Sequence, residues 1–270
     1  MHNKKTFYYS DPVNDDFAGT KINTITVDKG FTYLHNSLIW KIISWILYYI
    51  IAMPVMWIIA KIYLGFKVEN RNVLRPLRKQ GFFIYGNHTR ALDAFVSPLV
   101  TFPQKSYVIA GADAASLPGL KNIILMLGVL PIPTKLNGMS NFMNAVSARC
   151  REGNPVTIYP EAHIWPFYTG IRPFSDTSFR YPVKESVPAV AMVVTYRKRK
   201  GLFRLVKAPG MTVTLSEPVY PETDLPPKQI QKKMHEQIFE KMCSISAGKE
   251  QVEYYHYEYV PKQNEECLVD

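Results

Sequence analysis

Two clusters of ionisable side chains each follow a short apolar run and could carry acid–base chemistry. The first pairs His88 with Asp93 in the stretch GNHTRALD (86–93), directly after the apolar run 82–85. A carboxylate five positions on can return to the imidazole Nδ1–H if the loop turns into a helix. That pairing would fix the tautomer and raise the basicity of Nε2, as deprotonation of a hydroxyl requires. The alternative is a hydrogen-bonded loop histidine beside a capping aspartate.

The second cluster contains Pro160, Glu161 and His163 and follows the apolar run 156–159. Loops that leave the same edge of a sheet are where α/β folds usually place a site. Both clusters are therefore expected at one site, although Glu161 taken alone is better explained as a solvated loop acid. A developing oxyanion would need donors, and backbone N–H groups of the loop after His88 are the expected ones.

Several other chemistries are disfavoured by missing motifs. A metal site built from His88, Asp93, Glu161 and His163 would lack the usual helical i, i+4 histidine pair. No G-x-S-x-G elbow, Walker loop or G-x-G-x-x-G occurs. The three cysteines have no C-x-x-C spacing, so a reducing compartment fits. The basic run 197–200 is expected at a hairpin tip that faces an acidic surface, and no nucleic-acid partner is predicted.

The pattern of helices and strands that must position these residues is typical of an α/β domain. Beyond residue 80, short apolar runs alternate with helical periods, which is typical of that fold class. A helix is expected from an N-cap at Ser140 to a stop at Gly153, and an apolar stripe from Ile230 to Ile245 predicts another. Strands are expected at Phe82 to Tyr85, Tyr107 to Ile109, Val129 to Ile132, Val156 to Tyr159, Val187 to Thr195, Phe203 to Val206 and Met211 to Leu215.

An uncharged apolar stretch from Ile42 to Ala60, closed by a lysine at each end, predicts an N-terminal membrane-anchoring helix. Tryptophans lie towards its ends, where amphipathic rings prefer the interface. A buried core helix is the alternative, because Pro54 and two adjacent tyrosines weaken a simple span. Whether the helix crosses the bilayer or lies in one leaflet stays open.

The predicted division is an irregular arm (1–33) with one short strand near Ile22 to Val27, the anchor (34–64), a catalytic domain (65–250) and a tail (251–270).

The net charge of +10 and the pI near 9.3 favour a negatively charged partner. Anionic lipids attract each juxtamembrane Lys or Arg by about 1 kcal/mol, so membrane lipids are the expected partner. Basic residues follow the anchor, and the positive-inside rule then places the domain on the cytosolic face of the cytoplasmic membrane. These residues are Lys61, Lys67, Arg71, Arg75, Arg78 and Lys79.

Four blocks occur in one order: N-H-x-x-x-x-D at 87–93, GVLPIPTK at 128–135, YPE at 159–161 and VPAV at 187–190. In this, the chain resembles the glycerolipid acyltransferase family, which includes bacterial 1-acylglycerol-3-phosphate and lysophospholipid acyltransferases of phospholipid biosynthesis. The resemblance implies an α/β domain with a mixed β-sheet flanked by helices, a membrane-facing acyl tunnel and direct transfer without an acyl-enzyme. It also implies that His88 deprotonates the acceptor hydroxyl and that Asp93 orients it.

By the same resemblance, Pro160, Glu161, Thr134 and Lys135 would hold the acceptor. The donor would be acyl-CoA, an acylated carrier protein or an acyl phosphate, with no metal or other cofactor. The rival from another class is a catalytically silent, membrane-attached lipid-binding protein of the same fold.

The chain departs from the family pattern at the phosphate clamp. Thr134 and Ile164 stand where arginines are common, and Arg90 replaces a small polar residue. One hypothesis is that Arg90, Lys135 or Arg172 restores the charge that holds a phosphate. The other, which we favour from sequence, is that the acceptor lacks a terminal phosphate and that His163 and Trp165 contact a neutral or bulkier head group.

Overall fold

A seven-stranded sheet forms the centre of the protein, for which a computed structural model describes residues 4–17 and 24–261. Its strand order is β2-β8-β7-β3-β6-β4-β5, and every neighbouring pair is parallel except β7 with β8. The predicted α/β fold with a mixed sheet is confirmed. The strands are β2 (Lys67–Glu69), β3 (Phe82–Gly86), β4 (Tyr107–Ala110), β5 (Val129–Pro131), β6 (Pro155–Ile158), β7 (Ala189–Arg197) and β8 (Gly210–Leu215).

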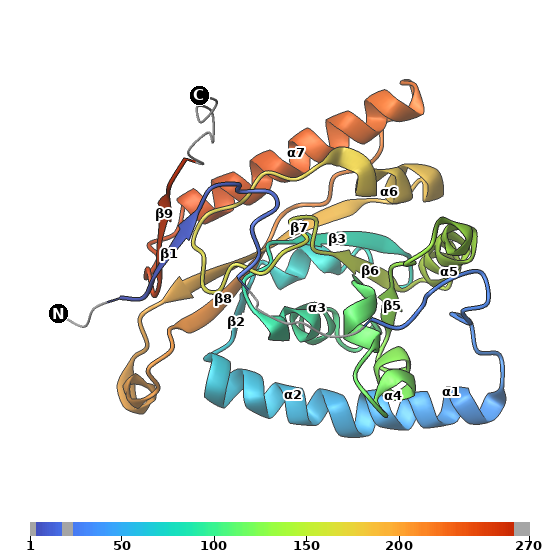
Figure 1. Ribbon diagram of the computed structural model, residues 1–270, viewed down its shortest axis with the longest axis horizontal. Helices are drawn as coiled ribbons and strands as arrows, with labels where there is room; N and C mark the ends of the chain where they lie inside the picture. The colour runs from blue at the N-terminus through green and yellow to red at the C-terminus, as the bar shows by residue number, and fades with distance from the viewer. Residues whose placement is uncertain (1–3, 18–23, 262–270) are drawn as a thin grey trace, which may run out of the picture.

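Both faces of this sheet are covered, which is why its central strands are apolar on both sides. In β3, Phe83 and Tyr85 join a core on one face, while Phe82 and Ile84 join a core on the other. This alternation is the two-residue period of a strand. The first face is covered by α5 (Met139–Arg151), α6 (Arg180–Glu185) and α7 (Pro227–Ala247), and the second by α3 (Val96–Thr101) and a long N-terminal helix (Figure 1).

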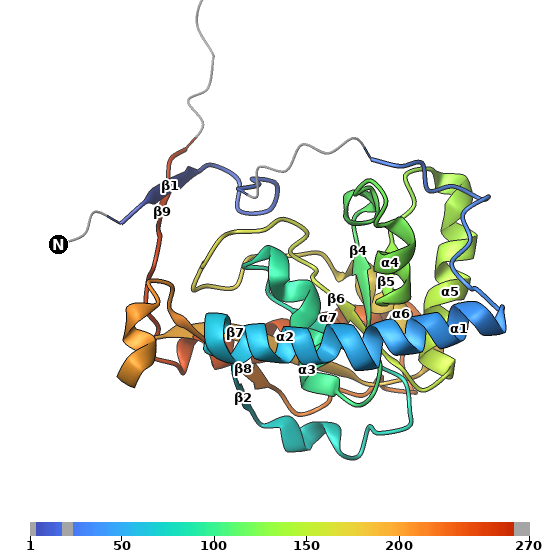
Figure 2. The same ribbon diagram turned by 90° about the horizontal axis from the view of Figure 1, so that it is seen from below.

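The long helix runs from Leu38 to Leu64 and is long and apolar enough to cross a membrane. It consists of α1 (Leu38–Trp45), a π-helical segment (Ile46–Ala52), α2 (Met53–Ile59) and a second π-helical segment (Ala60–Leu64). The first π-helical segment directly precedes the turn that contains Pro54, which has no N–H to donate. Figures 1 and 2 show that the helix lies along the domain and does not project from it.

One side of the long helix is part of the protein core, and the other side is exposed and apolar. Its buried apolar residues are Tyr48, Met53, Met56, Ala60 and Leu64, which pack with residues of the sheet and α3. Its exposed apolar residues are Leu38, Ile39, Ile42, Ile43, Trp45, Ile46, Ile50, Ile51, Val55, Trp57, Ile58, Ile62 and Tyr63. Both sides of the helix are therefore apolar. One side packs against the protein, and the other forms an uncovered apolar strip.

Some predicted elements differ from the structure. The strand expected at Phe203 to Val206 is wrong, because Gly201–Leu205 forms a 3₁₀ turn at the tip of the β7–β8 hairpin, where no neighbouring strand is available for pairing. Ser140 is not an N-cap, since α5 begins one residue earlier. For the strand expected near Ile22 to Val27, residues 22 and 23 lie outside the described residues, and residues 24–27 form none.

The arm and the tail meet in a small sheet of their own. β1 (Thr6–Tyr9) pairs in parallel with β9 (His256–Tyr259), and sequence patterning indicated neither strand. Both strands are short and rich in tyrosine, without the apolar run that marks a buried strand. The four-part division of the chain stays a prediction, although these two outer parts pack together.

Candidate active site

The loop after β3 brings His88 and Asp93 together. The imidazole Nδ1 lies 3.2 Å from Asp93 Oδ2, and the same oxygen accepts hydrogen bonds from the backbone N–H groups of Thr89 at 2.6 Å and Arg90 at 2.8 Å. The chain turns into a 3₁₀ helix, Ala91–Phe95, and this turn returns the carboxylate to the ring. Asp93 is completely buried, whereas the His88 side chain is 18% exposed. The arrangement is that of a base held by a fixed carboxylate.

Tyr159, the last residue before the second cluster, contacts both His88 and Asp93. Its ring stacks on the His88 imidazole with centroids 4.7 Å apart, and its hydroxyl donates to the main-chain carbonyl of Asp93. Burial, reinforced by the Asp93 carboxylate, raises the pKa of Tyr159 well above its usual value. The phenol therefore stays protonated and remains a donor.

The side chains on either side of His88 anchor the loop to β7. Asn87 extends the pairing between β3 and β7: its amide donates to the Val194 carbonyl at 3.0 Å and its carbonyl accepts from the Val194 N–H at 2.8 Å. The Thr89 hydroxyl lies 2.7 Å from the Tyr196 hydroxyl. Sequence reasoning missed Tyr196, because only the parallel pairing of β3 with β7 brings it to this loop. His88 is thus held between two fixed neighbours.

Glu161 and Arg172 form a buried ion pair directly behind the histidine. The guanidinium lies 3.3 Å from Glu161 Oε2, and both side chains are about fully buried. Glu161 also accepts the backbone N–H of His88 at 3.1 Å and that of Arg172 at 3.0 Å. Burial raises the pKa of Glu161, while the guanidinium and these donors oppose the rise. Glu161 therefore positions the His88 backbone and is not the solvated loop acid considered from sequence.

Arg172 is also occupied by main-chain carbonyls. Its guanidinium donates to the carbonyls of Glu161 at 3.2 Å, Pro12 at 3.3 Å and His163, and it lies over the Trp165 ring. Through these contacts, Arg172 holds the loop that contains Glu161 and His163 against the N-terminal arm. An acceptor in solvent reaches it only if the loop moves.

The N-terminal arm covers the second cluster. Trp165 donates its indole N–H to the Asp15 carbonyl at 2.7 Å and stacks on Tyr257 of β9. The His163 ring lies 3.9 Å from the Asp16 carboxylate and is partly exposed. Because Trp165 is completely buried, the hypothesis that it contacts an acceptor head group is wrong. Its ring fills the space between the loop and the β1–β9 pair.

Arg90 differs from Arg172 in having no carboxylate partner in the described part of the chain. Its guanidinium lies over the rings of Phe167, at 4.8 Å, and of Tyr63, at 5.6 Å, near the end of the long helix. Its Nη1 atom is buried without a hydrogen-bond partner among the described residues. The Arg90 cation therefore lies between the loop that carries His88 and the apolar helix, and its Nη1 atom is a hydrogen-bond donor without an acceptor among the described residues.

Thr134 and Lys135 lie on a more distant loop, after β5. β4 separates β5 from β6, and β6 separates β4 from β3. The Thr134 backbone and hydroxyl are bonded to Val27 of the N-terminal segment, at 2.9 Å and 3.0 Å. Lys135 is exposed. The structure thus gives Thr134 a role in fastening the N-terminal segment, and the acceptor-binding role of both residues stays a prediction.

The expectation that loop N–H groups after His88 bind an oxyanion is wrong for the first two residues. The N–H groups of Thr89 and Arg90 both point at Asp93, where they stabilise the carboxylate. The donors to an oxyanion must therefore come from other groups around His88.

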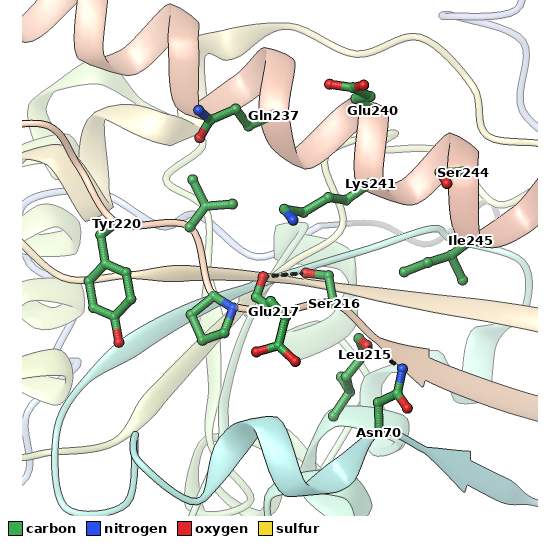
Figure 3. A pocket seen from close by; sticks show the side chains of 12 residues that line it. Asn70, Leu215, Ser216, Glu217, Tyr220, Gln237, Glu240, Lys241, Ser244 and Ile245 are labelled. Atoms are coloured by element: carbon green, nitrogen blue, oxygen red, sulfur yellow. Dashed lines mark hydrogen bonds between the residues drawn. The ribbon is translucent and has the colours of Figure 1, made fainter.

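A pocket of about 650 Å³ lies elsewhere, between the chain after β8 and α7 (Figure 3). Its polar wall includes Glu217, Glu240 and Lys241, and it contains none of the predicted site residues. Within residues 4–17 and 24–261, no group of three or more His, Cys, Asp or Glu side chains is arranged to hold a metal ion.

The fold agrees with what the comparisons find. A model of the acyltransferase family matches residues 65–214, more than half of the chain, so the protein belongs to this family. The crystal structure of the 1-acyl-sn-glycerophosphate (LPA) acyltransferase, PlsC, from Thermotoga maritima is similar, with a TM-score of 0.51 and 16% identity over 73% of this chain and 82% of that chain. A comparison with curated protein sequences finds no match. The glycerolipid acyltransferase family predicted from the sequence motifs is confirmed.

Proposed function

We propose that this protein transfers a fatty acyl group from a thioester donor, acyl-CoA or an acylated carrier protein, to the hydroxyl of a lysophospholipid-like acceptor. The observation that carries the proposal is the His88–Asp93 pair. Its carboxylate is completely buried and accepts three hydrogen bonds, while the imidazole remains accessible. Membership of the acyltransferase family supports the reaction type.

In the proposed reaction, Nε2 of His88 takes the proton of the acceptor hydroxyl as the oxygen attacks the thioester carbonyl. The new carbon–oxygen bond gives a tetrahedral intermediate, which collapses with cleavage of the carbon–sulfur bond. The imidazolium then returns its proton to the departing thiolate. Asp93 stabilises the imidazolium through Nδ1 and keeps the ring in the tautomer that leaves Nε2 free. The products are the acylated lipid and a free thiol.

For the acceptor, the structure favours a charged head group over the neutral one that we favoured from sequence. Arg90 provides an unpaired guanidinium one residue from Thr89 and close to the long helix. A guanidinium offers two parallel donors that match a phosphate. We therefore propose that Arg90 contacts the acceptor phosphate in place of the arginines that the family motif has elsewhere.

We further propose that the long helix lies in the plane of one leaflet on the cytosolic side of the cytoplasmic membrane. A helix that crosses a bilayer is surrounded by lipid or by other spans, whereas this helix has Tyr48, Met56 and Leu64 in the core of the catalytic domain. Its opposite side is apolar, with Trp45 and Trp57 exposed, as in helices that lie at an interface. The lipid acceptor would then reach His88 from the leaflet.

The enzymatic proposal is tested by incubating the purified full-length protein with acyl-CoA and a panel of lysolipids, with thiol release and the lipid product measured together. Transfer to a lysolipid is expected, and Glu240→Gln, in the distant pocket, serves as a matched control with unchanged turnover. Lipid binding without thiol release would favour the silent lipid-binding protein. The membrane arrangement is tested separately by substitution.

Removal of the long helix is an unsuitable test, because it would expose the core residues that pack on it. Instead, Ile42, Ile46 and Ile50 are exposed and lie four residues apart on one side. Their joint replacement by glutamine should move the protein from the membrane to the soluble fraction. Tyr220→Gln, at an equally exposed aromatic residue outside the helix, is the control. Membrane pelleting that persists in high salt in the triple variant would contradict the arrangement.

A further inference from the structure

The hairpin between β7 and β8 carries exposed apolar side chains that the fold does not use. Its tip is the 3₁₀ turn Gly201–Leu205. Phe203 is 50% exposed and Leu205 is 86% exposed. Neither residue belongs to the two hydrophobic cores. An isolated exposed leucine is ordinary, but here both residues stand on a protruding tip that is otherwise strongly basic.

Four cations surround these two residues. All four are exposed, and none has a carboxylate partner in the described part of the chain; they are Lys198, Lys200, Arg204 and Lys207. The sequence alone led us to expect that this basic run faces an acidic surface, and no carboxylate among residues 4–17 and 24–261 pairs with these four cations. Their charge is therefore available to a negatively charged surface.

Two arginines at the base of the hairpin fasten it to the end of the long helix. Arg199 is almost fully buried and donates to the carbonyls of Ile62 and Tyr63, while Arg197 donates to the Gly65 carbonyl at 2.6 Å. The last carbonyls of a helix have no partners within it, so these donors satisfy groups that would otherwise need water. The views in Figures 1 and 2 agree that the hairpin and this end of the helix lie side by side.

The hairpin also leaves the sheet at the edge where His88 lies. β7 runs parallel to β3, so both strands end at the same edge. The last part of β7 contains Tyr196, whose hydroxyl contacts Thr89 next to the histidine. A surface that binds the hairpin tip is therefore adjacent to the catalytic loop.

We propose that the β7–β8 hairpin is a second membrane-docking element, which inserts Phe203 and Leu205 into the anionic leaflet that holds the long helix. This inference rests on the proposed membrane attachment. Apolar side chains flanked by lysines and arginines match the boundary between acyl chains and anionic head groups. An acidic carrier protein would also match the cations. The lipid surface is favoured because the tip adjoins the exposed apolar side of the helix, so the two surfaces can share one leaflet.

A second contact would define how the enzyme sits on the membrane. A single helix lying in a leaflet leaves the domain free to tilt along the direction of the helix. The hairpin lies beyond the C-terminal end of the helix and is tied to it through Arg197 and Arg199 (Figures 1 and 2). Insertion of both would oppose this tilt and hold the edge that carries His88 towards the leaflet.

The first test is flotation of the full-length protein with vesicles of phosphatidylcholine alone or mixed equally with phosphatidylglycerol. Each cation near an anionic leaflet strengthens binding about fivefold, so Lys198→Gln with Lys200→Gln should weaken binding to the mixed vesicles about 25-fold. Phe203→Ser with Leu205→Ser should weaken it at least about tenfold. The matched control is Lys228→Gln with Lys232→Gln, two exposed lysines on α7 across the sheet, and it should leave binding unchanged.

The second test reports the position of the tip directly. Cys243 and Cys267 are replaced by serine, which leaves only the buried Cys150, and a polarity-sensitive dye is attached at Leu205→Cys. Mixed vesicles should shift the emission of this dye to the blue. The same dye at Glu236→Cys, exposed on α7, should not respond.

The outcomes separate the two proposals. If the wild type binds mixed vesicles while both hairpin variants bind equally well and the dye at position 205 stays in water, the hairpin proposal is overturned and the helix remains the membrane contact. If the hairpin variants keep vesicle binding but lose activity only with a carrier-protein donor, the hairpin is a carrier-docking surface and the proposal is likewise overturned. If the wild type binds no vesicles, the membrane attachment itself fails.

Discussion

The Nδ1 atom of His88 lies 3.2 Å from Oδ2 of Asp93, an oxygen that also accepts the N–H groups of Thr89 and Arg90. Those two donors fix the carboxylate whether or not the imidazole carries a second proton. Asp93 therefore orients the ring and leaves Nε2 without a contact to this carboxylate, as the proposed role of His88 requires. The pair is built by one loop, so its geometry depends little on distant parts of the chain.

Replacing Asp93 by asparagine should reduce turnover by about 10²-fold or more, because an amide can hold the ring but selects the wrong tautomer. Steady-state rates for the purified variant, with thermal unfolding to confirm the fold, provide the measurement. Unchanged activity would reduce Asp93 to a structural cap of the 3₁₀ turn.

The buried pair of Glu161 and Arg172 predicts a coupled effect on stability. Arg172→Met should lower the free energy of unfolding by about 3 to 5 kcal/mol, because it leaves a buried carboxylate without its cation. Adding Glu161→Gln should recover part of that loss, since the amide oxygen can still accept a backbone N–H. Urea unfolding of both single variants and the double variant completes the cycle. Strictly additive losses would show that the two side chains do not stabilise each other.

Lys105 predicts a specific pH dependence of stability. Its ammonium group donates to the Ser44 hydroxyl and the Met126 carbonyl, and burial, aided by Arg149 and opposed by Glu152, lowers its pKa from 10.5 to about 8. Between pH 8 and 10.5 the unfolded chain holds a proton that the folded protein has lost. The free energy of unfolding should therefore rise across this window, by about 3 kcal/mol in total.

The comparison that isolates this effect is wild type against Lys105→Met, unfolded with urea at several pH values from 7.5 to about 10.5. As the pH rises, the free energy of unfolding of the wild type should increase relative to that of Lys105→Met. A difference that stays constant across the window would show that Lys105 titrates as an ordinary surface lysine.

Arg90 should set the preference for the acceptor head group. Arg90→Ala should reduce kcat/KM for lysophosphatidate about 10- to 100-fold, which corresponds to loss of a charge-assisted contact, while a neutral lysolipid is affected much less. Lys232→Ala, at an exposed cation on α7 away from His88, serves as the matched control. A uniform loss for all acceptors would assign Arg90 to the structure of the loop, through its contacts with Phe167 and Tyr63.

Strands β3 to β8 and the pairing of His88 with Asp93 were predictable from sequence because their signals are local, whereas β1, β2 and β9 were not. The run Phe82 to Tyr85 is apolar on both sides since both faces of β3 are covered, and the spacing of His88 and Asp93 suffices for one turn of helix to join them. The contacts that occupy Arg172 were not fully predictable, because Pro12 reaches it only through the packing of the arm. Both sides of the long helix are apolar, so hydrophobicity alone could not separate anchor from core.

The central claim is that His88 is the base that activates the acceptor, and replacement of this residue tests it most directly. His88→Ala should be measured in the full-length protein with acyl-CoA and the best lysolipid, with mass spectrometry of the acylated product. Product formation should fall at least about 10²-fold, the scale expected for loss of a general base, while thermal unfolding and vesicle binding stay as in the wild type. Product formation near the wild-type rate in a variant that is fully folded and bound to membranes would contradict it.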